Sequence, residues 1–135
     1  MNIEIVDNPA AMQLAYRILA GAVHQSAAAI RMTFESDSAS AAIDYLLSGE
    51  WVEQDRVQGE LYPRALNRFK LMAGLEYWRA DIKQTGRIVL TMDEKLFEFN
   101  VTFEKRDGVE EMLAEATELG PDLRSEIVET HPQSP

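Results

Sequence analysis

The segment from Ile88 to Phe103 constrains the fold more than any other, because apolar and polar residues alternate along it twice. The apolar positions are Ile88, Leu90 and Met92 in the first half, and Phe97, Phe99, Val101 and Phe103 in the second. Between the halves, Asp93 and Glu94 are polar residues that can turn the chain. The pattern therefore predicts a β-hairpin, with the second stripe of apolar residues in the core.

Two amphipathic helices are predicted ahead of this hairpin. The first can be capped by Asp7 or Asn8, with Pro9 in its first turn, where a missing N–H costs nothing. Its apolar residues follow helical spacing: Met12, Ala15, Ile18, Leu19, Ala22 and Val23. The second has Pro63 in its first turn and ends near Gly74. Its shared apolar face is Leu61, Ala65, Phe69 and Met72.

Two further strands are predicted from alternation of apolar and polar residues. The first has Ile30, Met32 and Phe34 on one side, and the second has Ile43, Tyr45 and Leu47. Ser48-Gly49 allows a turn before Trp51 and Val52. At least four strands and two helices, joined mostly by short turns, predict an α+β fold: an antiparallel sheet of about four or more strands with helices packed on one face.

The C-terminal part gives a weaker pattern. Asp107-Gly108 interrupts the alternation, and residues 109–119 are good helix formers, so we favour a helix there and leave a strand open. From Gly120 onward, prolines, acids and Ser/Thr leave little to bury. The sequence thus predicts one domain over 1–119 and an acidic, Pro-containing disordered tail over 120–135.

Charge and composition exclude several classes of function. Thirteen Lys and Arg against 23 Asp and Glu give a formal net charge of -10, which disfavours binding to nucleic acid or anionic membrane. The absence of cysteine excludes disulfides and thiolate metal sites and suits a reducing compartment. There is no basic leader and no apolar run of transmembrane length. We expect a bacterial-type cytoplasmic domain without membrane insertion.

Motifs that carry catalysis are missing from the sequence. No glycine-rich G-x-x-x-x-G-K-[ST] loop is present to hold phosphates, and no serine lies in a G-x-S-x-G context. His24 and His131 have no metal-ligand spacing. The sequence predicts no catalytic residues, no metal and no cofactor, and therefore not an enzyme.

The run from Leu61 to Leu75 contains R-F-K-L-M-A-G-L at 68–75, and Gln84-Thr85-Gly86-Arg87-Ile88 follows. These segments resemble R-x-K-x-M-A-G-L and Q-D-G-R-I in the secretion-motor ATPases of type II secretion and type IV pilus assembly. In that family they belong to the middle domain, just before the nucleotide-binding core. Weaker similarity extends over roughly residues 5–103. The resemblance implies a stand-alone, degenerate copy of that domain without the Walker A core.

The departures from the family pattern are mostly polar. Where the family has Asp and His before the first strand, this chain has Ala29 and Arg31. The family's later arginines and turn acids are replaced at Asp44, Leu46, Ser48, Thr85 and Asn100. The glycines at Gly49, Gly74 and Gly86 are kept, and we expect all three at turns. Since family arginines reach toward nucleotide phosphates, the resemblance makes Arg87 a position of that kind, and the losses argue against nucleotide binding.

Seven residues are candidates for contacts with a partner. Arg64, Arg68, Lys70 and Arg87 are candidate anion or partner contacts, and Trp51, Tyr77 and Trp78 are candidate interface aromatics. Each has a plainer alternative. The cations of the second helix could pair with Glu60 or other acids, and Arg87 could be solvated or paired with a carboxylate. The aromatics could fill the core.

A retained scaffold without a nucleotide loop suggests function by protein contact. We expect an adaptor that self-associates or binds a motor or a related regulatory component. The alternative is a module that senses a small molecule or nucleotide, with Arg68, Lys70 and Arg87 as anion contacts.

Overall fold

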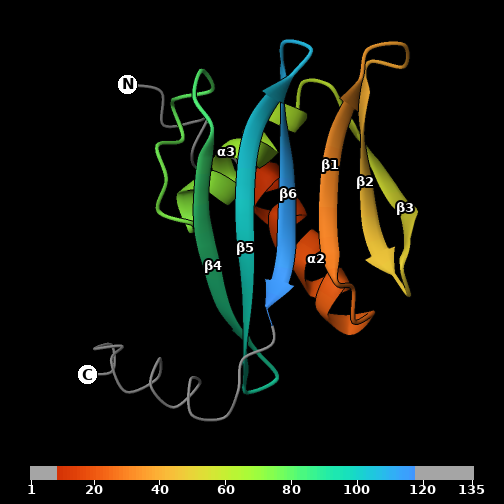
Figure 1. The fold of residues 1–135 in the computed structure, drawn as a ribbon, viewed down its shortest axis with the longest axis vertical. Helices are drawn as coiled ribbons and strands as arrows, with labels where there is room; N and C mark the ends of the chain where they lie inside the picture. Colours follow the sequence, from red (N-terminus) through yellow and green to blue (C-terminus); the bar gives the residue numbers. More distant parts are fainter. Residues whose placement is uncertain (1–8, 118–135) are drawn as a thin grey trace.

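The computed structural model describes residues 9–117, which contain a six-stranded antiparallel sheet in the order β3-β2-β1-β6-β5-β4 (Figure 1). The strands are β1 (Ala29–Glu35), β2 (Ser40–Leu47), β3 (Glu50–Gln58), β4 (Gln84–Met92), β5 (Lys95–Arg106) and β6 (Val109–Thr117). The helices are α2 (Pro9–His24), which precedes β1, and α3 (Tyr62–Met72), which lies between β3 and β4. The expected cap at Asp7 or Asn8 and the expected tail at 120–135 lie outside the described residues.

Three strand connections are tight turns of the same kind. Both central residues have a positive φ in Ser48-Gly49, in Asp93-Glu94 and in Asp107-Gly108. Such turns match the right-handed twist of the strands they join and so favour hairpins. The hairpin predicted from Ile88 to Phe103 is confirmed, and its two strands pair from Gln84–Phe103 to Met92–Lys95.

The helix favoured for residues 109–119 is wrong, because β6 occupies this segment up to Thr117. The Asp107-Gly108 turn sends the chain back along β5, and β6 then pairs with β5 on one side and β1 on the other. Met112 and Ala114 alternate into the core. Hydrogen bonds along both edges and this burial outweigh a helix preference of a few tenths of a kcal/mol per residue.

The predicted fold class also needs correction, since the protein is mostly sheet. Half of the described residues are in strands and a quarter in helices, so the molecule is not the α+β arrangement expected. Besides β6, the sequence pattern missed most of β3, in which only Val57 is buried. This strand lies at an edge of the sheet, where charged residues on both faces remain in water and hide the alternation.

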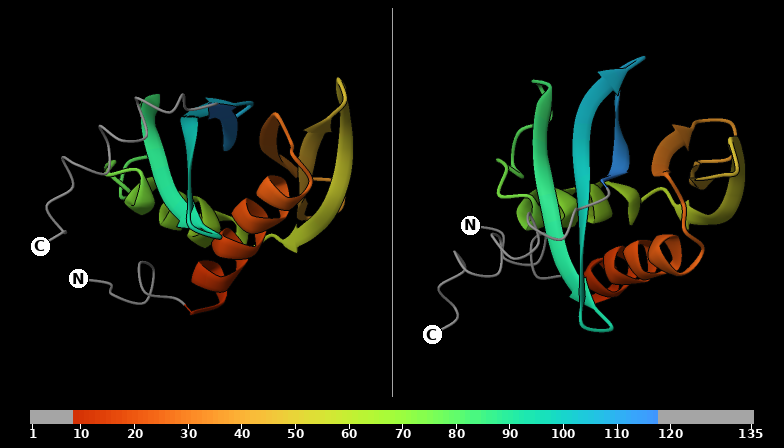
Figure 2. Two further views of the ribbon diagram at one scale, coloured as in Figure 1. Left: turned by 90° about the horizontal axis from the view of Figure 1, so that it is seen from below. Right: turned by 60° about the horizontal axis from the view of Figure 1, so that its bottom comes forward.

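The sheet is curved, and α2 and α3 lie on its inner side (Figure 2). The core combines apolar residues of both helices with those of every strand, including Leu19, Phe69, Ile30, Phe99 and Phe103. Helix α2 packs closely against β2, where the Tyr45 hydroxyl donates a hydrogen bond to the Ile18 carbonyl at 2.5 Å. Gly21 makes room for this contact, because a Cβ at that position would lie 2.5 Å from the hydroxyl. The outer face of the sheet carries no helix within residues 9–117. None of the described helices is long and apolar enough to cross a membrane.

Candidate functional site

The solvent side of α3 carries two arginines without a counter-charge. Arg64, Arg68 and Leu71 follow at i, i+4 and i+7, which places them along one side of the helix, away from the buried Ala65 and Phe69. Leu71 is 37% exposed. Neither arginine forms a hydrogen bond or ion pair with any residue of 9–117, and the Arg68 Nε atom is buried without a hydrogen-bond partner.

This isolation distinguishes the two α3 arginines from the others that the structure describes. Every other arginine of residues 9–117 lies at salt-bridge distance from a carboxylate: Arg17, Arg31, Arg56, Arg79, Arg87 and Arg106. The alternative that Arg64 or Arg68 pairs with Glu60 or another acid is therefore not realised within this part of the chain. Like charges one helical turn apart also disfavour the helix slightly.

Lys70 is buried, so it is not available as a surface contact. Its side chain has 0% exposure, and Nζ lies 2.6 Å from Glu110 Oε2. Nζ also donates to Glu110 Oε1 at 2.8 Å and to the Arg79 carbonyl at 2.6 Å. The Phe103 ring lies 5.6 Å away. The burial of Lys70 was not foreseen, because the neutralising carboxylate comes from β6, a segment for which a helix was favoured and a strand left open.

The loop from α3 to β4 is held from inside by Lys70 and by the buried side chain of Gln84. Gln84 Oε1 accepts from the Glu76 amide at 2.9 Å, and Nε2 donates to the carbonyls of Glu76 and Arg79 at 3.0 and 3.2 Å. These contacts fix the backbone on both sides of Tyr77 and Trp78. The indole of Trp78 is 67% exposed and meets the Tyr77 ring edge-on at a centroid distance of 5.1 Å.

Arg87 and Trp51 lie on the outer face of the sheet, away from α3. Arg87 Nη1 lies 3.4 Å from Glu98 Oε1, which fits the alternative that it is paired with a carboxylate. Trp51 is 37% exposed and stacks under the Arg31 guanidinium at 4.2 Å. The core alternative is therefore wrong for Trp51, as it is for Trp78. Because Lys70 is buried and Arg87 lies on the opposite face from Arg68, these three cations do not form one anion site.

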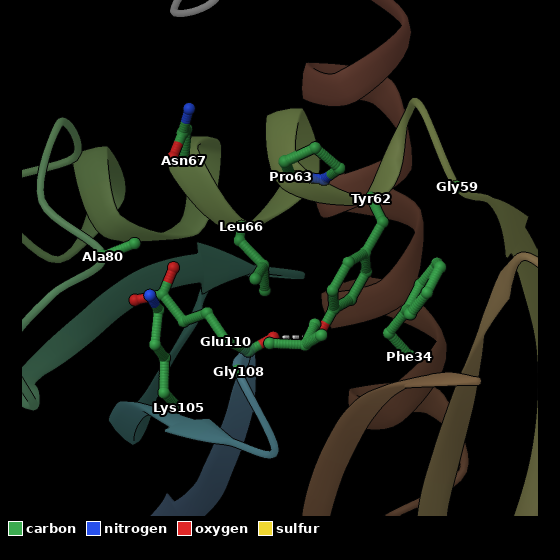
Figure 3. Close-up of a pocket in the computed structure, with 11 residues that line it drawn as sticks. Phe34, Gly59, Tyr62, Pro63, Leu66, Asn67, Ala80, Lys105, Gly108 and Glu110 are labelled. Atoms are coloured by element: carbon green, nitrogen blue, oxygen red, sulfur yellow. Dashed lines mark hydrogen bonds between the residues drawn. The ribbon is translucent and has the colours of Figure 1, made fainter. Parts of the chain in front are cut away.

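A cavity of about 340 Å³ opens beside the first turns of α3 (Figure 3). Its apolar wall includes Phe34, Tyr62, Leu66 and Val109, and its polar wall is Asn67, Lys105 and Glu110. The Tyr62 hydroxyl donates to the Glu110 carbonyl at 2.7 Å and lies 3.2 Å from the Met32 carbonyl. Burial raises the pKa of Tyr62 well above its ordinary value, and the charges of Glu111 and Glu110 raise it further.

The polar residues of this cavity come from distant parts of the sequence and were not predicted as site residues. Tyr62 and Glu110 are 48 positions apart. Recognising Asp107-Gly108 as a hairpin turn would have placed Glu110 beside Lys105, which is its partner in the β5–β6 register. The Asp107-Gly108 turn was therefore the feature of the sequence from which the position of Glu110 could have been predicted.

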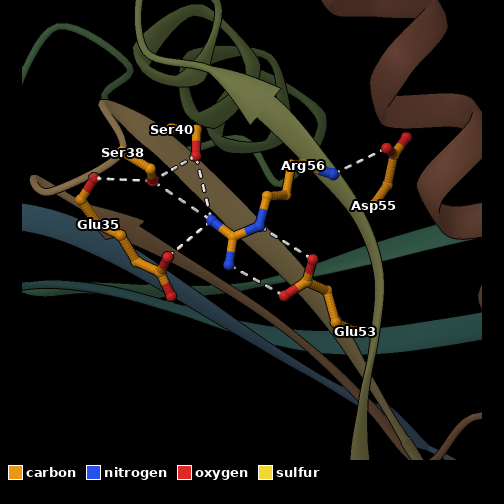
Figure 4. Close-up of polar contacts among 6 residues, drawn as sticks. All are labelled: Glu35, Ser38, Ser40, Glu53, Asp55 and Arg56. Atoms are coloured by element: carbon orange, nitrogen blue, oxygen red, sulfur yellow. Dashed lines mark hydrogen bonds and ion pairs between the residues drawn. The ribbon is translucent and has the colours of Figure 1, made fainter.

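A second missed cluster centres on Arg56, at the exposed edge of the sheet (Figure 4). Its guanidinium contacts Glu53 through Nε and Nη2 at 3.0 and 3.1 Å, and Glu35 through Nη1 at 2.6 Å. Nη1 also lies 3.1 Å from the Ser40 hydroxyl. Hydrogen bonds to Glu35 and Glu53 raise the pKa of Arg56. The cluster joins β3 to the β1–β2 turn and gives the edge strand a structural tie.

Residues 9–117 contain no group of three His, Asp or Glu side chains placed to hold a metal ion. The arrangement described above presents unpaired arginines, an exposed indole and a small cavity.

The fold is similar to part of a protein of known structure. No protein-family model and no curated protein sequence matches the chain. Among solved structures, part of an ATPase has a similar fold. That structure is the ATPase DotB of Legionella pneumophila, with 15% sequence identity and a TM-score of 0.52. The match covers 87% of this chain and 34% of DotB, so the chain spans about a third of the length of its neighbour. The likeness shows the fold alone.

Proposed function

We propose that this is a non-catalytic protein-interaction domain related to the secretion and pilus motor ATPases. It binds an acidic surface of a partner protein through the solvent side of α3. The observation that carries the proposal is the Arg64–Arg68 pair, which has no counter-charge among residues 9–117 although the chain as a whole has a formal net charge of -10.

Retaining this pair costs the isolated domain stability. Two like charges one turn apart disfavour the helix by about 0.2–0.5 kcal/mol. A buried donor without an acceptor, such as Arg68 Nε, costs about 1–3 kcal/mol. A partner carboxylate would relieve the repulsion between the two charges and form charge-assisted hydrogen bonds with the guanidinium groups.

Apolar contacts support the same surface. Leu71 extends the arginine stripe along α3, and the following loop presents Trp78 on a backbone that Lys70 and Gln84 hold in place. Arginine and tryptophan dominate the binding energy of many protein interfaces. A fixed loop also lowers the entropy lost on binding. A suitable partner surface is acidic, with an apolar side chain within it.

The test is site-specific photo-crosslinking in the native host, with benzoylphenylalanine in place of Leu71. We expect an adduct that disappears when Arg64→Glu and Arg68→Glu are added. The matched control, Lys95→Glu, alters another exposed cation and should leave the adduct unchanged. An adduct that persists in the Arg64→Glu/Arg68→Glu protein would refute binding through this pair. Mass spectrometry of the adduct distinguishes a separate partner from a second copy of this chain.

The non-catalytic part of the proposal has its own test. The 135 residues contain no G-x-x-x-x-G-K-[ST] loop, which is the sequence observation behind it. Purified protein should release phosphate from ATP at the rate of the buffer. Hydrolysis above that rate that is lost in Arg87→Ala would show that the domain is catalytic.

A further inference from the structure

We propose that the cavity beside α3 binds a small organic anion with one carboxylate and an aryl or alkyl body. The cavity is independent of the arginine stripe, because Pro63, Leu66 and Asn67 line it from another side of the helix. Its volume of about 340 Å³ lies within the range of small-molecule sites.

The wall of the cavity fits an apolar ligand body. The rings of Phe34 and Tyr62 lie side by side with a centroid distance of 5.9 Å, and Leu66 and Val109 continue this wall. At Gly59 the backbone passes close to the Phe34 ring and to the β1–β2 turn. An added Cβ would lie 2.9 Å from the Ala39 carbonyl oxygen and 3.4 Å from the Phe34 ring. The aromatic wall is therefore held in position by close packing, and a ligand would meet a preformed surface.

The charges around the cavity select an anion. Glu110 contributes a carboxylate, but Lys70 lies within 2.8 Å of both its oxygens and neutralises it. Lys105 then remains as an exposed lining cation that lies at salt-bridge distance from no carboxylate of residues 9–117, and its charge acts at longer range on Asp81. Figure 3 shows Lys105 and Glu110 across the cavity from Phe34. A bound carboxylate would meet Lys105 while its apolar body contacts the aromatic wall.

The start of α3 adds to this preference. Residues Tyr62 and Pro63 line the cavity, and no side chain caps the helix, whose N-cap residue is Leu61. An uncapped helix N-terminus carries a partial positive charge. Asn67, one turn further along, also lines the cavity.

The test uses 4-phenylbutyrate and its neutral analogue 4-phenylbutanol, followed by ¹⁵N–¹H NMR titration of the full chain. We expect 4-phenylbutyrate to shift the amides of Gly108, Val109 and Glu110, and to bind at least about fivefold more tightly than the alcohol. Lys105→Gln should lower this preference and leave the affinity for the alcohol unchanged. The matched control is Lys95→Gln at the other end of β5, which should change neither affinity.

A second variant tests the cavity itself. Ala80 is an exposed lining residue, so Ala80→Phe should fill the opening and abolish both titrations without unfolding the protein. Ala10→Phe, at an exposed position of α2, is its control. The assignment is overturned if 10 mM 4-phenylbutyrate leaves these amides unshifted, or if acid and alcohol bind equally before and after Lys105→Gln. The assignment is also overturned if an acidic peptide shifts the amides of Gly108, Val109 and Glu110 and 4-phenylbutyrate does not, since the cavity would then be a peptide site. None of these results depends on Arg64 or Arg68.

Discussion

Lys70 and Glu110, 40 positions apart in the sequence, form a buried ion pair in which Nζ lies 2.6 Å from Oε2. The pair joins α3 to the start of β6 and also holds the Arg79 carbonyl of the following loop. A buried pair of this kind adds little net stability over apolar residues, but the loss of one partner leaves the other charge uncompensated. Its main effect is to fix α3 and the loop to one position on the sheet.

Lys70→Met should therefore lower the free energy of unfolding by about 3–5 kcal/mol, since Glu110 would remain buried and charged. Urea denaturation measures the change, with exposed Lys95→Met as the control. The double variant Lys70→Met/Glu110→Leu should recover much of the loss. A single-variant loss below about 1 kcal/mol would mean that water reaches Glu110 readily.

Tyr62 should make the protein sensitive to alkali. Burial raises its pKa in the folded state above its unfolded value, so its contribution is fully present below about pH 10 and is lost as the pH rises further. The free energy of unfolding of the wild type should thus fall more steeply between pH 9 and 11 than that of Tyr62→Phe, by at most about 1.4 kcal/mol per pH unit. Tyr45, whose pKa is also raised, is present in both proteins. Parallel curves would contradict the assignment.

Gly86 should not tolerate a side chain. It lies within β4 and not at a turn, which corrects the sequence expectation. An added Cβ would lie 3.1 Å from Leu75 Cδ2 and 3.2 Å from the Ala73 carbonyl. Gly86→Ala should cost about 1–3 kcal/mol of unfolding free energy, whereas Thr85→Ala at the exposed neighbouring position should stay within about 0.5 kcal/mol. Equal stability of the two variants would show that the loop moves aside.

Arg56→Gln should loosen one corner of the sheet without unfolding it. Because its contacts with Glu35, Glu53 and Ser40 are at the surface, the thermal midpoint should change little. Amides of residues 36–40 in the β1–β2 turn should exchange with solvent faster, and high salt should produce the same change in the wild type. Arg106→Gln, which breaks another surface pair, is the control and should leave this turn unaffected.

Local signals predicted the helices and the hairpin from Ile88 to Phe103 well, since each depends on residues close in sequence. Non-local pairing was harder to predict. The strand β6 is stabilised by β1 and β5 on its two sides, so its own helix-forming residues pointed to the wrong structure. The edge strand β3 lacks a buried face and gives little periodicity.

The residues of the candidate site also fall into two groups: those whose positions depend on nearby residues and those whose positions depend on distant strands. The helical spacing of Arg64 and Arg68 was enough to expect them on one side of α3, where the structure places them. The burial of Lys70 depends on Glu110, and the fixed position of Trp78 depends on Gln84 and Lys70. Neither of these contacts produces a recognisable pattern of residues in the sequence. The cavity near Tyr62 likewise exists only because β6 returns beside β5.

The central position of β6 has a consequence for synthesis on the ribosome. Until Thr117 has left the exit tunnel, the β1–β3 segment and the β4–β5 hairpin have no strand between them, since β6 joins β1 to β5. The emerging chain therefore carries two open sheet edges, which can pair with other chains. A translational pause before this point would prolong that exposure, and a pause after it would give the domain time to close.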